Sequence, residues 1–63
     1  TDQLFISGIN GEYTFSIIDL LGKRITTDKA NENKIQIGYL TEGMYLLKVE
    51  QEGRTYLSKF IRN

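Results

Sequence analysis

The chain has 63 residues, carries eight basic and eight acidic side chains, and contains no histidine, cysteine, proline or tryptophan. This length suits one small domain, and the composition excludes disulfides and thiolate or imidazole metal sites as means of stabilising it. A net charge of zero provides no field that attracts phosphate backbones, and no apolar run approaches the roughly 18 residues of a membrane span. We therefore expect no nucleic-acid partner and no membrane insertion.

Composition and spacing favour strands. The apolar residues include eight isoleucines but only one alanine and one methionine, a bias toward residues that fit a pleated surface. Turn-forming residues recur at short intervals, and apolar and polar residues alternate between them. This pattern predicts six strands, over residues 3–7, 13–19, 23–27, 34–37, 44–51 and 54–62.

Turn chemistry predicts how the first strands connect. Asn10-Gly11, in which both residues tolerate positive φ, predicts a hairpin after the first strand. Asp19 and Gly22 predict a tight turn, with the aspartate accepting from turn amides and the glycine supplying a left-handed residue. Residues 28–33 are polar and without apolar periodicity, so they predict a loop.

The second half contains a compact connection over residues 38–43, in which Leu40 is predicted to plug the core, and a hairpin at Glu52-Gly53. The last strand is ambiguous because it carries apolar residues on both faces. That pattern predicts either a central strand or an edge strand that expects a partner.

Several strands carry bulky residues on both faces, as Phe5 lies opposite Leu4 and Ile6. One flat sheet would leave one of those faces wet, so two packed sheets are favoured. The predicted fold class is therefore all-β, a small antiparallel β-sandwich.

The sequence offers little for catalysis. Its serines have no histidine to activate them, and Glu50 and Glu52 flank a turn, which favours a solvated rim over a glycosidase pair. The segment 28–33 lacks the glycine and glutamate of a calcium loop and contains Lys29. We expect no enzyme activity, no metal and no cofactor.

Four tyrosines leave two interpretations open. They form either an aromatic platform for a sugar or core and half-buried residues whose hydroxyls reach the wet edge, and their alternation along strands favours the second. The tyrosines are Tyr13, Tyr39, Tyr45 and Tyr56.

An ordered set of motifs closely resembles a known family. The segments are LFI (4–6), FSIIDLLGKRI (15–25), IQI with Leu40 (35–40), GMYLLKV (43–49) and YLSKFIR (56–62). Together they resemble the type A C-terminal sorting domain of cargo proteins of the Bacteroidetes type IX secretion system, over nearly the whole chain. The immunoglobulin-like fold of that family agrees with a sandwich of six to seven short strands.

The family's proline-containing lead-in is missing, since this chain has no proline. We expect residues 1–63 to be a single sorting domain that lacks a few N-terminal residues of the full domain. The resemblance also implies which residues match the signal-bearing motifs. These residues are Gly22, Lys23, Gly43, Tyr45, Lys59, Phe60, Ile61 and Arg62.

The resemblance implies a secretion signal that directs a cargo protein, attached upstream, through the type IX outer-membrane translocon. A sortase-like cysteine protease usually removes such a domain. The cargo would cross the periplasm and then be released or held at the cell surface. The physics of the last strand suits edge-to-edge pairing with a receptor strand, although its basic residues also suit protection against aggregation.

Two other functions remain open on the sequence. The four tyrosines suit an immunoglobulin-like accessory module that binds a glycan or a partner protein on a secreted protein. A cell-surface spacer without a recognition role is the third hypothesis.

Overall fold

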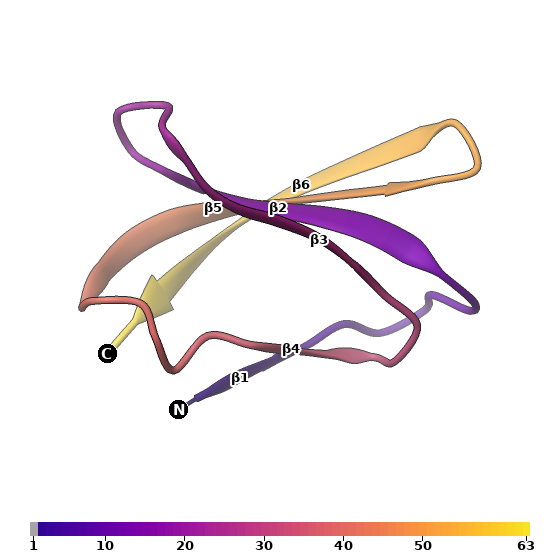
Figure 1. Cartoon of the computed structure of the whole chain (residues 1–63), viewed down its shortest axis with the longest axis horizontal. Coiled ribbons are helices and arrows are strands. Elements are labelled where there is room, and N and C mark those ends of the chain that lie inside the picture. The colour runs from indigo at the N-terminus through magenta and orange to yellow at the C-terminus, as the bar shows by residue number, and fades with distance from the viewer. Residues whose placement is uncertain (1) are drawn as a thin grey trace.

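The computed structural model describes residues 2–63, which form six β-strands and no helix (Figure 1). Thr1, the first residue of the predicted domain, lies outside the described residues. The strands are β1 (Gln3–Phe5), β2 (Tyr13–Asp19), β3 (Arg24–Ala30), β4 (Lys34–Gln36), β5 (Gly43–Gln51) and β6 (Arg54–Arg62). No helix long and apolar enough to cross a membrane occurs in this part of the chain.

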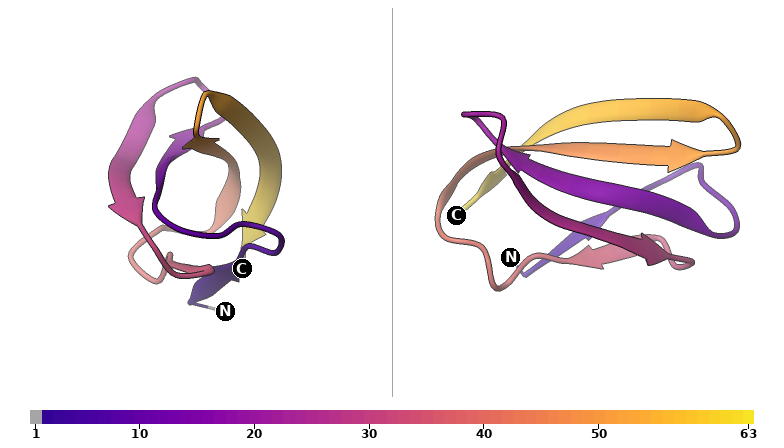
Figure 2. Two further views of the ribbon diagram at one scale, coloured as in Figure 1. Left: turned by 90° about the vertical axis from the view of Figure 1, so that its right-hand side faces the viewer. Right: turned by 45° about the horizontal axis from the view of Figure 1, so that its top comes forward.

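The strands form two antiparallel sheets. The larger sheet has the order β3-β2-β5-β6, and the smaller one pairs β1 with β4. In the end-on view of Figure 2, the larger sheet curls into an arch, and β1 and β4 lie across its open side. The predicted all-β fold of two packed sheets, a small immunoglobulin-like sandwich, is confirmed.

The core lies between the inner face of the larger sheet and the smaller sheet. Its centre is the β2–β5 pair, where Phe15 faces Val49 and the fully buried Ile17 faces Leu47. Burying alternate large apolar side chains in this way stabilises both strands at once. The buried apolar residues are Tyr13, Phe15, Ile17, Ile35, Ile37, Leu40, Tyr45, Leu47 and Val49.

The first predicted hairpin is wrong. β1 pairs with β4, with Leu4 opposite Ile35, and not with β2. The chain between β1 and β2 has positive φ at Gly8 (80°) and Gly11 (79°), whereas Asn10 does not have the positive φ that a type I′ turn needs. The glycines therefore turn the chain from one sheet to the other, which lets Leu4 and Ile6 pack against the core.

The predicted loop at residues 28–33 is also partly wrong, because β3 continues to Ala30. Asp28, Lys29 and Ala30 pair with Phe15, Thr14 and Tyr13 of β2. β3 is an edge strand, exposed along most of its length, so its place depends on pairing with β2 and not on an apolar pattern of its own. Apolar periodicity alone misses such a strand.

The remaining turns follow their predicted chemistry. The Asp19 carboxylate oxygen Oδ1 accepts from the amides of Leu21 (3.0 Å) and Lys23 (2.8 Å), and Gly22 has a φ of 87°. Leu40 is buried, and its amide donates to the carbonyl of Ile37 (3.0 Å), so it plugs the core as predicted. The predicted bounds of β2 and β6 match the observed ones, and those of β1, β4 and β5 differ by one or two residues at one end.

The last strand is an edge strand of the larger sheet, which decides between the two alternatives left by the sequence. β6 pairs with β5 over its whole length, from Gly43 opposite Arg62 to Gln51 opposite Arg54. Its residues are exposed except for Phe60 and Arg62, which are half-buried. One side of a nine-residue strand is therefore left without a neighbouring strand.

Tyr13 makes the stability of this core depend on pH. Its hydroxyl donates to the carbonyl of Glu32 (2.6 Å), and burial, together with the nearby Glu32 carboxylate, raises the pKa of Tyr13 above its ordinary value. A raised pKa in the folded state means that ionisation opposes folding. The contribution is fully present below the pKa of the unfolded tyrosine, about 10, and is lost as pH rises through the higher folded value.

We predict that Tyr13→Phe lowers the free energy of unfolding by about 1 kcal/mol at neutral pH, because one hydrogen bond is lost. The variant should also lose less stability than the parent chain between neutral pH and pH above about 10. Urea unfolding at several pH values measures both. Equal loss of stability in the two proteins at high pH would contradict the assignment.

Candidate functional site

The structure brings the eight predicted signal residues to one end of the larger sheet. Gly43 faces Arg62 and Tyr45 faces Phe60 across the β5–β6 pair. Asp19 faces Tyr45 across the β2–β5 pair, so the β2–β3 turn, which holds Gly22 and Lys23, lies at the same end. Lys59 and Ile61 alternate with Phe60 and Arg62 along β6 and so lie on its outer face. We call this group of eight residues the strand-end cluster.

The glycine of this cluster is required by the backbone. Gly43 has a φ of 151°, a conformation that residues with a Cβ rarely adopt. The nearest atom to a Cβ built on Gly43 would be a ring carbon of Tyr45 at 3.9 Å, an ordinary contact. Conformation and not space therefore requires glycine where the connection enters β5.

Tyr45 links the core to the chain segment between β4 and β5. Its ring stacks on Phe60, with centroids 5.6 Å apart and planes at 22°. Its hydroxyl donates to the carbonyl of Thr41 (2.7 Å) and lies 3.1 Å from the Thr41 hydroxyl. The buried tyrosine thus fixes the connection and supports the half-buried Phe60 of the edge strand.

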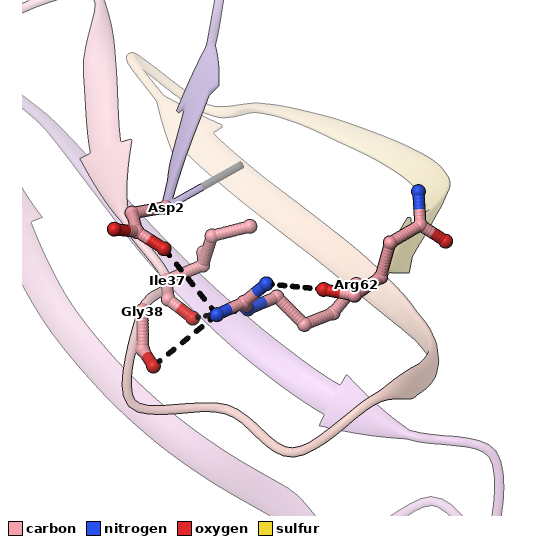
Figure 3. A network of polar contacts seen from close by, with 5 residues as sticks. Asp2, Ile37, Gly38 and Arg62 are labelled. Atoms are coloured by element: carbon pink, nitrogen blue, oxygen red, sulfur yellow. Dashed lines mark hydrogen bonds and ion pairs between the residues drawn. The ribbon is translucent and has the colours of Figure 1, made fainter.

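Arg62 ties the end of β6 to the β4–β5 connection and to Asp2, next to the smaller sheet (Figure 3). Its Nε donates to the carbonyl of Ile37 (3.2 Å), and one Nη donates to the carbonyl of Gly38 (3.4 Å). The same Nη lies 3.4 Å from the carboxylate of Asp2, and the other Nη donates to the carbonyl of Asn63. The Arg62 side chain is 16% exposed and that of Asp2 is 78% exposed. We call this set of contacts the Arg62 clamp.

The carbonyl bonds are the stronger part of the clamp. The bond to the Ile37 carbonyl is partly buried, and a hydrogen bond from a charged group in such a place contributes more than an ion pair with a solvated carboxylate, which is screened by water and salt. The fork of the guanidinium lets one side chain reach two successive carbonyls, which a lysine ammonium does less well.

The outer face of the larger sheet is unusually apolar at this end. Met44 faces Ile61 across β5 and β6, and both are exposed, at 40% and 60%. Lys59 faces Leu46 on the same face, and Leu57 is 65% exposed. Apolar side chains interrupted by lysine are typical of surfaces that meet a partner and also of edges protected from aggregation.

Lys23 and Gly22 remain in the solvent. The exposed turn residues Leu20 (62%) and Leu21 (93%) lie directly before them. This turn is held by the Asp19 carboxylate, and the pairing of Asp19 with Tyr45 places it at the same end of the sheet as the rest of the strand-end cluster.

The tyrosines do not form one platform. Tyr13 and Tyr45 are buried in the core, as the structural interpretation of the sequence predicted. Tyr39 lies in the connection before β5, and its hydroxyl is hydrogen-bonded to the Thr26 hydroxyl (2.8 Å). Tyr56 lies at the other end of the sheet, opposite Val49 near the end of β5. Two separate exposed tyrosines give a flat sugar no continuous aromatic surface.

The carboxylates suit the solvated rim predicted for them. Glu50 lies on β5 and Glu52 lies in the turn, with a φ of 51°. Within residues 2–63, no group of three or more carboxylates is placed to hold a metal ion, and no buried side-chain nitrogen or oxygen lacks a partner.

Sequence reasoning missed the partners of Arg62. The carbonyls of Ile37 and Gly38 carry no side-chain signal, and Asp2 lies 60 residues away in the chain. Every type of residue presents the same backbone carbonyl, so the residue types at positions 37 and 38 give no clue to this role. Only the position of the β4–β5 connection beneath the end of β6 makes these two carbonyls a site.

Fold and site together define a small two-sheet β-sandwich whose last strand is an edge strand, is clamped to the β4–β5 connection and carries exposed basic and apolar side chains. Comparison with protein families gives a match over residues 1–63 to the secretion system C-terminal sorting domain. The chain therefore belongs to the family of type IX secretion C-terminal sorting domains. A comparison with curated proteins finds no match.

Membership defines the domain's general role. It is a secretion signal of the type IX system, carried as the tail of a cargo protein that is exported to the cell surface or beyond. The family consists of signals and is not known to be catalytic.

We predict that Arg62→Ala lowers the free energy of unfolding by about 2 kcal/mol, because two carbonyls lose a charged donor. Asp2→Ala should cost less than about 0.5 kcal/mol, since its carboxylate is solvated. Arg54→Ala, at the other end of β6, is the matched control and should change stability little. Chemical unfolding measures all three, and an equal loss for Asp2→Ala and Arg62→Ala would contradict the division of energy within the clamp.

Proposed function

We propose that the strand-end cluster is the part of the domain that the type IX outer-membrane translocon recognises. The observation that carries the proposal is the register of β5 and β6, which sets Gly43 opposite Arg62 and Tyr45 opposite Phe60. Residues from motifs that are far apart in the sequence therefore lie together at one end of one sheet. A single receptor surface can contact them together.

Within the cluster, the residues divide into two kinds of role. Gly43, Tyr45 and Arg62 hold the shape of the sheet end, through backbone conformation, stacking and the Arg62 clamp. Lys59 and Ile61 lie on the outer face, where a receptor can reach them, and Gly22 and Lys23 present a neighbouring turn. Phe60 belongs to both, being half-buried against Tyr45.

The finer steps of export belong to the same proposal. Residues 1–63 act as one recognition unit of a Bacteroidetes cargo protein that passes through the periplasm. A sortase-like cysteine protease then cuts upstream of the domain, and the cargo is released or kept at the surface. Asp2 lies beside Arg62, so the start of the described chain is next to the strand end that we propose is recognised.

The test is export of a periplasmic reporter fused upstream of residues 1–63 in a type IX-competent bacterium. We predict that Ile61→Ser reduces the exported fraction about tenfold, as expected when an exposed anchor of an interface is lost. Ile25→Ser is the matched control, because Ile25 is also exposed (40%) but lies on β3, at the other edge of the sheet.

Reporter in the medium and on the cell surface is measured against reporter in the periplasm, and thermal unfolding of each purified variant excludes misfolding. Retention of the unaltered fusion in the periplasm would overturn the proposed function. Equal export of the Ile61 and Ile25 variants would remove Ile61 from the recognised surface.

A further inference from the structure

The two sheets leave a groove on the side of the molecule where the end of β1 and the edge strand β6 lie. A cavity of about 310 Å³ opens there, between the chain at residues 5–9 and the inner faces of β5 and β6. Leu47 and Val49 form its floor, Tyr56 and Ser58 line the β6 side, and Phe5 and Ile9 line the other. Phe5 is 73% exposed and Tyr56 is 49% exposed, so large apolar side chains stand at its rim.

Beside this groove, the turn at the start of β6 fixes which backbone groups point outward. Glu52 and Gly53 both have positive φ, 51° and 80°, which defines a two-residue type I′ hairpin. The flanking pair Gln51 and Arg54 is then hydrogen-bonded, and bonded and non-bonded pairs alternate along the ladder. Tyr56 and Ser58 therefore bond to β5, whereas Leu57 and Lys59 present their N–H and C=O groups to the free edge.

The charge of β6 limits what can pair with that edge. The strand carries Arg54, Lys59 and Arg62 and no acidic residue. A second copy paired antiparallel in full overlap would set Arg54 of each chain against Arg62 of the other. A register centred on Lys59 would set the two lysines against each other. Like charges opposite one another destabilise strand pairing, so this edge disfavours a second copy and favours an acidic strand.

We propose that the groove and the free edge of β6 accept one extended strand of a partner protein. Its inward side chains are aliphatic and fill the cavity over Leu47 and Val49, and its outward side chains carry carboxylates beside Lys59. The strand adds to the sheet through the outward backbone groups of Leu57 and Lys59, a recognition mode in which the backbone gives affinity and alternate side chains give specificity.

This inference rests on the proposed function, because it names the chemistry of the partner that recognises β6. It also gives the strand-end cluster a second purpose. The Arg62 clamp and the Tyr45–Phe60 stack fix one end of β6, and the type I′ turn fixes the other. An edge strand held at both ends loses little freedom when a partner strand pairs with it.

The probe is a blocked nine-residue peptide of alternating valine and glutamate, compared with one of alternating valine and lysine, each titrated into the isotope-labelled chain. We expect the glutamate peptide to bind at least about tenfold more tightly, because its carboxylates attract the basic side chains of β6 whereas the lysines of the other peptide repel them. It should slow hydrogen exchange of the Leu57 and Lys59 amides and perturb the Leu47 and Val49 methyl resonances.

Three variants locate the binding. Lys59→Glu should reverse the preference between the two peptides, whereas Lys29→Glu, an exposed lysine on the opposite edge strand β3, should leave it unchanged. Ser58→Phe should fill the groove and abolish binding of both peptides without loss of thermal stability.

Equal affinity for the two peptides, or an unchanged preference in the Lys59 variant, would overturn the proposal. So would protection of the Leu57 amide by self-association, which sedimentation of the chain alone detects. The reporter export described above is scored separately. Normal export with no peptide binding rejects only the acidic strand, whereas failure of export with peptide binding intact rejects only the type IX recognition.

Discussion

The structure depends on covering one wide sheet face with a narrow second sheet. The buried β2–β5 pair supplies most of the core, and the two-stranded β1–β4 sheet lies across it. Two strands cannot cover four. The inner face of β6, an edge strand of the larger sheet, therefore stays partly exposed beside a cavity. The same small size that limits the core thus creates an open edge on the last strand.

An edge strand with one neighbour needs further contacts to hold it in place. Arg62 joins the end of β6 to the β4–β5 connection, and Tyr45 joins that connection to Phe60. These contacts keep a strand in one register although only one neighbour pairs with it.

Sequence patterns predicted the parts of this fold that bury apolar side chains. The alternation of Tyr13, Phe15 and Ile17 identified β2, and Leu40 was identified as a core plug. The same logic missed the second half of β3, whose place depends on pairing with β2, and it mistook the Asn10-Gly11 segment for a hairpin. The backbone carbonyls held by Arg62 could not be predicted, since their identity as a site arises only from tertiary position.

The most direct test of this account is native-state hydrogen exchange of the free domain, read amide by amide along β6. We expect alternation, with slow exchange at Tyr56, Ser58 and Phe60, whose amides bond to β5, and fast exchange at Leu57 and Lys59, whose amides face the open edge. Uniformly slow exchange along the strand would show that the edge is already occupied, and would contradict a free recognition strand.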